Sequence, residues 1–253
     1  MWWLIFAAFA GASPTKPADV LVVVSPGFSL QSHAPLIRAI MNEGYVTHAH
    51  TFPCTGQDSH AMASSIATTA AELTRPYVVV AHGAGATLSL MAADGLQAES
   101  YVLLAPILDV WPIAAFEWLQ TKQLEPGINL STPATWQGHD LHTLLLGEEA
   151  PALSCVSLGL AREAQQWLAN GIPTQHLKDI ESPVFIAVSL GDNLSTMEAV
   201  VPASRQLPNR TLMRMGVKRF DPVDFTHVQM LTHSVPIGVA LDAIADQISP
   251  EKK

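Results

Sequence analysis

Residues 78–88 read VVVAHGAGATL, and this stretch decides the fold. An unbroken β-branched run comes first, a turn of small residues follows, and a helical pattern comes last, so the stretch predicts a strand, a sharp turn and a helix. The small residues let the strand and the helix approach each other closely around a strained turn. Gly83 relieves that strain, because glycine accepts a positive φ freely.

The rest of the chain repeats this alternation. We predict strands over residues 20–25, 45–52, 77–81, 101–105, 184–189 and 211–215, and helices over residues 34–42, 62–73, 87–96 and 236–248. Short apolar strands separated by helices are typical of a doubly wound, mainly parallel sheet that is buried on both faces. The sequence therefore predicts one α/β domain over residues 20–253.

The interval from about residue 111 to residue 177 breaks this rhythm, because it is long, rich in Trp, Gly and Pro, and carries helical pieces such as residues 158–169. We predict a cap-like insertion that covers the carboxyl edge of the sheet, where ligands bind in such folds. Its tryptophans are either core residues or the lining of a cleft, which would then favour an apolar ligand. They are Trp111, Trp118, Trp136 and Trp167.

Composition excludes several classes of protein. Apolar residues make up 49% of the 253 residues and charged residues 14%, which is enough for a sizeable core and argues against disorder. The formal net charge is -9 with 13 Lys and Arg residues, and no basic run stands out, so the electrostatic footprint of a nucleic-acid-binding protein is missing. No stretch reaches the roughly 18 to 20 apolar residues that span a membrane.

The first residues look like a targeting segment. Residues 2–12 are almost all apolar, and Ala10-Gly11-Ala12 fits the small-x-small pattern of a signal peptidase site. We predict a signal peptide over residues 1–12 and a secreted or periplasmic protein. The alternative is an apolar first element packed on the core of a cytoplasmic protein. In an exported protein Cys54 and Cys155 can form one disulfide, and the alternative is two buried thiols.

Residues 78–88 resemble the nucleophile elbow, G-x-S-x-G, of the α/β-hydrolase superfamily, whose members include esterases and lipases. Ala81 and Gly85 take the two small positions, and Gly83 falls where the nucleophilic serine stands. The resemblance implies an esterase- or lipase-like ancestor whose nucleophile position is vacant here.

Two further loops resemble parts of the same fold. Residues 24–28, VSPGF, resemble the oxyanion loop, so Phe28 or Ser29 would supply one backbone N–H donor and Ala84, after the elbow position, the other. Residues 51–59, TFPCTGQDS, resemble the loop that follows the next strand in this superfamily.

The carboxyl-terminal half supplies the remaining matches. Residues 184–193, VFIAVSLGDN, resemble the strand that ends at the catalytic acid, and Asp192 falls at that position. Residues 224–231, DFTHVQML, resemble the loop of the catalytic histidine, which would be His227, and His233 fits that loop less well. The superfamily order of nucleophile, acid and histidine becomes Gly83, Asp192 and His227.

A glycine at the nucleophile position has chemical consequences. No acyl-enzyme can form on it, so the first hypothesis is an impaired hydrolase that binds a small apolar ligand, an ester-like molecule or a protein partner. The alternative is an active enzyme, an ester hydrolase or a non-hydrolytic one, in which the Asp192–His227 dyad acts as general base. Replacement nucleophiles would be Ser25, more typical of a loop residue, or Cys54, in a loop near the pocket rim.

Neither a metal ion nor a cofactor is predicted. His48 and His50 alternate on one strand, and His139 and His142 are three apart in the insertion, but neither pair gains further ligands at a familiar zinc spacing. His82, beside the elbow position, is expected to be a packed residue.

Overall fold

The computed structural model describes residues 18–54, 57–108 and 175–248, and shorter pieces at 123–124, 127–129, 135–136, 139–140, 155–157, 159–160, 163, 166–167 and 172–173. The predicted signal peptide lies outside the described residues, and so does most of the predicted insertion. Among the described helices, none is long and apolar enough to cross a bilayer.

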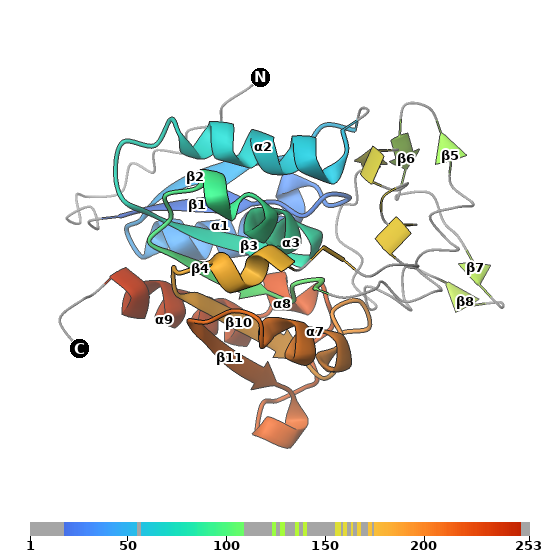
Figure 1. Cartoon of the computed structure of the whole chain (residues 1–253). Coiled ribbons are helices and arrows are strands. Elements are labelled where there is room, and N and C mark those ends of the chain that lie inside the picture. Colours follow the sequence, from blue (N-terminus) through green and yellow to red (C-terminus); the bar gives the residue numbers. More distant parts are fainter. Residues whose placement is uncertain are drawn as a thin grey trace.

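A parallel sheet of six strands forms the centre of the molecule, in the order β11-β10-β4-β3-β1-β2 (Figure 1). The strands are β1 (Asp19–Val23), β2 (Val46–His50), β3 (Tyr77–His82), β4 (Ser100–Leu104), β10 (Val184–Ser189) and β11 (Arg210–Met215). Successive side chains of a strand point to opposite faces, so the apolar strands fill two cores at once. This arrangement confirms the predicted doubly wound α/β fold.

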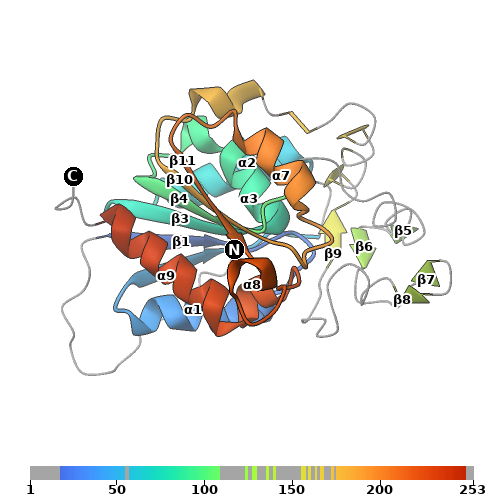
Figure 2. The same ribbon diagram turned by 90° about the horizontal axis from the view of Figure 1, so that it is seen from below.

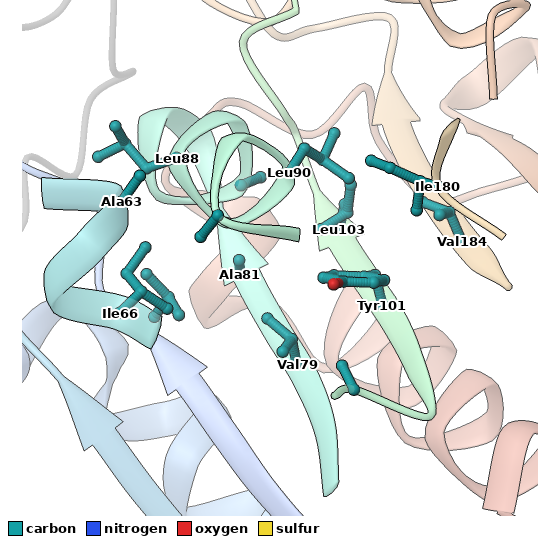
Figure 3. Packing of buried hydrophobic residues seen from close by; sticks show 14 of the residues in the cluster. Ala63, Ile66, Val79, Ala81, Leu88, Leu90, Tyr101, Leu103, Ile180 and Val184 are labelled. Atoms are coloured by element: carbon teal, nitrogen blue, oxygen red, sulfur yellow. The ribbon is translucent and has the colours of Figure 1, made fainter. Parts of the chain in front are cut away.

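Helices cover both faces of the sheet (Figure 2). The first face carries α2 (Ser59–Ala70), α3 (Gly83–Met91) and α7 (Met197–Ser204), and the second carries α1 (Leu30–Asn42), α8 (Gln229–Thr232) and α9 (Ser234–Ile248). Strand β3 shows the division, since Val79 packs in the first core and Val78 in the second. Figure 3 shows the first core, where Ile66 of α2 and Leu88 of α3 lie over Val79 and Ala81.

Several helices begin earlier than the hydrophobic pattern predicts. Helix α1 starts at Leu30 because Ser29 caps it, with its side chain accepting the N–H of Ser32. Asp58 caps α2 in the same way through the N–H of Ala61. Helix α3 starts at Gly83 itself, so the turn and the helix share their residues. Short 3-10 helices complete the described part, at η1 (Ala93–Gly95), η2 (Gln175–Asp179) and η3 (Val217–Arg219).

The described pieces of the insertion lie beyond one end of the main sheet (Figure 1). Strands β5 (Gln123–Leu124), β6 (Gly127–Asn129) and β9 (Cys155–Ser157) pair antiparallel, and so do β7 (Thr135–Trp136) and β8 (His139–Asp140). Of the predicted helical stretch 158–169, residues 159–160, 163 and 166–167 are described, and they are helical. The bounds of 111–177 for the insertion stay a prediction.

The insertion is anchored to the loop before α2. Ser157 donates its hydroxyl hydrogen to the carbonyl oxygen of Gln57, and the N–H of Leu160 donates to the same oxygen at 3.1 Å. The carboxylate of Glu163 accepts the N–H of Ser59 at 2.6 Å. Cys54, in the same loop, is disulfide-bonded, and the sequence holds one other cysteine, Cys155.

Candidate active site

The bend between β3 and α3 is built around Gly83. This residue has φ of 54°, in the left-handed region that side-chain-bearing residues avoid. A Cβ atom built on Gly83 would lie 2.9 Å from Nε2 of His227 and 3.0 Å from Oγ of Ser25. The structure therefore brings the imidazole and a hydroxyl to the space where a residue-83 side chain would begin.

His227 and Asp192 form a buried pair. Nδ1 of His227 lies 2.8 Å from Oδ2 of Asp192, and the two residues are 1% and 3% exposed. The other carboxylate oxygen accepts the N–H groups of Leu194 and Ser195, each at 2.8 Å, so the carboxylate is held from both sides. Since Nδ1 faces a carboxylate, it carries the hydrogen, and the lone pair lies on Nε2. Within the described part of the chain Nε2 is buried without a hydrogen-bond partner, which leaves it able to accept a proton.

The loop that carries Asp192 packs directly on the loop that carries His227. The contact is made by Gly191, where a Cβ atom would lie 2.5 Å from the carbonyl oxygen of Asp224 and 3.0 Å from that of Phe225. No side chain fits between the two loops at this point. The glycine thus sets the distance over which the carboxylate reaches the imidazole.

Two more histidines pack behind His227. The ring of His82 lies 4.2 Å from that of His227, and its Nε2–H donates to the carbonyl oxygen of His227 at 3.0 Å. The ring of His33 lies 5.7 Å from that of His82. Burial lowers the pKa of His33 to about 4 and holds the pKa of His82 well below 6.5. Both rings are therefore neutral at pH 7, and His82 is the packed residue that the sequence predicts.

The three residues predicted to donate to an oxyanion lie in different backbone environments. The N–H of Phe28 donates to the carbonyl oxygen of Ser25 at 3.0 Å, so a turn of the loop already uses it. Ser29 is the N-cap of α1. Ala84 lies in the first turn of α3, where backbone N–H groups have no acceptor within the helix. Of the three, Ala84 has the geometry that best suits a developing anion.

An apolar wall lies beside the bend. Ala84, Ile107 and Ile172 form a small separate cluster against which Trp167 packs. They line a small cavity together with Thr87, Leu88 and Leu160. Trp167 is thus one predicted tryptophan that does line a cavity, whereas the side chains of Trp111, Trp118 and Trp136 lie outside the described residues.

Other residues singled out in the sequence lie elsewhere. His233 packs on Phe225 with ring centroids 4.9 Å apart, and its Nδ1 accepts the N–H of Val235 at 3.2 Å. The disulfide at Cys54 removes the thiolate that attack would need. His48 bonds to Asp19, and His50 bonds to hydroxyls of α2. Among the described residues, no group of three or more His, Cys, Asp or Glu side chains is placed to hold a metal ion.

The proximity of Ser25 to Gly83 was not predicted from the sequence. Val23 pairs with Ala81 in the register of β1 and β3, and two residues beyond this pair Ser25 lies beside Gly83. The signal for this proximity is the strand order, which places β1 directly against β3. Residue spacing along the chain does not contain that information.

A buried Asp–His pair at the carboxyl ends of a parallel sheet, facing a tight strand–turn–helix bend, matches the arrangement around the elbow of the α/β-hydrolase fold. The family model described as "Alpha/beta hydrolase family" matches residues 21–246, and this chain belongs to that family. No curated protein sequence matches the chain.

Solved structures of esterases and lipases share the fold. A monoacylglycerol lipase of Paleococcus ferrophilus is 15% identical with a TM-score of 0.67, over 92% of this chain and 95% of that one. Est1E of Butyrivibrio proteoclasticus with bound ferulic acid is 17% identical with a TM-score of 0.59, over 93% and 91%. A soluble variant of monoglyceride lipase of Saccharomyces cerevisiae, with a substrate analog, is 12% identical with a TM-score of 0.63, over 97% and 89%. At these identities the likeness concerns the fold.

Proposed function

We propose that this protein descends from an esterase- or lipase-like serine hydrolase and has lost acyl transfer through residue 83. One observation carries the proposal: Gly83, at the bend, offers no attacking atom to a His227 imidazole whose Nε2 has no hydrogen-bond partner among the described residues. Removing the nucleophile of a serine protease triad leaves only about 10³- to 10⁴-fold acceleration over water. We expect hydrolysis through the ordinary route to keep no more than that residual acceleration.

The remaining chemistry belongs to the Asp192–His227 dyad. Asp192 fixes the tautomer and orientation of His227, and Nε2 removes a proton from a nucleophile or from a bound substrate. The apolar wall of Ala84, Ile107 and Trp167 favours a small, largely apolar ester as the substrate. The esterases and lipases that share the fold support the same class of molecule.

Hydrolysis of short p-nitrophenyl esters tests the dyad. We expect slow turnover by the wild type and a loss of about 10²-fold or more in His227→Ala and Asp192→Asn, the usual contribution of a general base. His60→Ala, at an exposed histidine of α2, is the matched control and keeps the wild-type rate. Turnover that is unchanged in His227→Ala contradicts the proposal.

A second function is binding of a small apolar ligand, or of a protein partner, without turnover. The apolar cluster of Ala84, Ile107 and Ile172, against which Trp167 packs, favours the first of these. A fatty acid or a non-hydrolysable ester analogue that raises Tm, in a protein without His227-dependent esterase activity, would support this alternative.

We also propose that the protein is exported, as its amino-terminal sequence predicts. The disulfide at Cys54 supports export, because disulfides persist in oxidising compartments. Fractionation of producing cells, with amino-terminal sequencing of the mature protein, tests the proposal. A cytoplasmic protein that keeps residues 1–12 refutes it.

A further inference from the structure

The space over Gly83 holds two reactive groups. Ser25 Oγ and His227 Nε2 both lie within 3.0 Å of the point where a residue-83 side chain would begin. Nε2 of His227 is buried and has no hydrogen-bond partner within the described part of the chain. A hydroxyl and an unpartnered base thus converge on one point.

We propose that Ser25 supplies the nucleophile that position 83 lacks, so that the attacking hydroxyl belongs to the loop after the neighbouring strand β1. The inference rests on the proposed function in one respect, which is that His227 acts as the base. The proposal also gives Gly83 a structural role. A side chain at residue 83 would fill the space between Ser25 and His227, so the glycine is what lets the two groups approach each other.

The backbone around Ser25 is fixed. Its N–H donates to Nε2 of His33 at 3.4 Å, and its carbonyl oxygen accepts the N–H of Phe28 at 3.0 Å. Helix α3 packs against it through Gly85, where a Cβ atom would lie 3.2 Å from the Cα of Ser25. The residue is 2% exposed. Both glycines of the bend therefore face Ser25, and the site holds it in one backbone geometry.

The covalent steps balance with an ester and water as the only reactants. Nε2 of His227 takes the Ser25 hydroxyl proton, directly or through one water, and Oγ forms a bond to the ester carbonyl carbon. The negative carbonyl oxygen lies toward the N–H of Ala84. Collapse breaks the bond to the alcohol, which leaves with the proton from His227. Water then attacks acyl-Ser25 by the same route, and the acid leaves.

A cysteine at position 25 tests the pairing without relying on turnover. No described cysteine is free, so Ser25→Cys introduces the reactive thiol. A thiol beside an imidazole ionises more readily, so we expect iodoacetamide at pH 6 to alkylate it at least tenfold faster than the thiol of Ser25→Cys combined with His227→Ala. Ser64→Cys, at an exposed serine of α2, is the control and reacts at the same rate with or without His227. Equal rates for the two Ser25→Cys proteins overturn the proposal.

A fluorophosphonate probe locates the nucleophile in the wild type. We expect the adduct on the peptide that contains Ser25, no adduct in Ser25→Ala, and normal labelling of Ser64→Ala. Thermal unfolding shows that each variant folds. Turnover that depends on His227 but persists in Ser25→Ala leaves the dyad function standing and overturns the role of Ser25. An adduct on another serine overturns it as well.

Discussion

Replacing Gly83 by alanine tests how crowded the bend is. Two costs add in this variant. A residue with a Cβ atom at φ of 54° costs about 1 to 2 kcal/mol. The new atom also lies 2.9 Å from His227 Nε2 and 3.0 Å from Ser25 Oγ, closer than carbon tolerates, and overpacking of this kind costs about 1 to 3 kcal/mol. We expect Gly83→Ala to lower the free energy of unfolding by about 2 to 5 kcal/mol.

Thermal unfolding followed by circular dichroism measures this change. For a domain of this size the loss corresponds to a fall in Tm of roughly 4 to 20 °C. Gly238→Ala is the control, since a Cβ atom there meets nothing within 4 Å. That residue lies inside helix α9, where alanine is favoured over glycine by about 0.5 to 1 kcal/mol, so Tm should rise. A Gly83→Ala protein as stable as the wild type would show that the space over the bend is open. That result would contradict the close approach of Ser25 and His227 to this space.

Three further predictions concern stability. Burial lowers the pKa of His33 to about 4 while the unfolded value is 6.5, so the unfolded state binds more protons between these values, and stability is lost as the pH is lowered from 6.5 towards 4, by up to about 1.4 kcal/mol per pH unit. Urea unfolding at pH 7 and pH 5 should show a smaller difference in His33→Gln than in the wild type or in His60→Gln. Reduction of the disulfide at Cys54 should lower the stability by about 2 to 4 kcal/mol, measured with and without reductant, and an unchanged unfolding curve would contradict its structural role. Ser157→Ala removes one of the two hydrogen bonds to the partly buried Gln57 carbonyl and should cost about 0.5 to 1.5 kcal/mol, with faster proteolysis of the insertion than of the main domain.

The strands were predictable because a strand that is buried on both faces consists of a continuous run of apolar residues. Strand β10 has the predicted bounds, Val184–Ser189, and the others differ by a few residues at their ends. Helices α7 and α8 escaped prediction, since they are short and α7 contains Pro202. Helix α1 was predicted to begin at residue 34 because its first turn, residues 30–33, precedes the regularly spaced apolar positions.

The candidate site was predictable where it follows the order of the chain. Asp192 and His227 were expected to meet, and their side chains lie in hydrogen-bond contact. The proximity of Ser25 depends on which strands are neighbours, and the use of the Phe28 N–H depends on the turn that the loop adopts. Both are properties of the folded backbone, so residue types and spacing did not reveal them.

The packing at Gly191 has a consequence for motion. Since the two loops touch backbone to backbone, neither can shift without carrying the other, and acid and imidazole travel as one rigid unit. Their alignment is thus ready before any ligand arrives. One added methyl group at residue 191 would wedge the loops apart and uncouple the proton acceptor from its carboxylate, without altering either side chain.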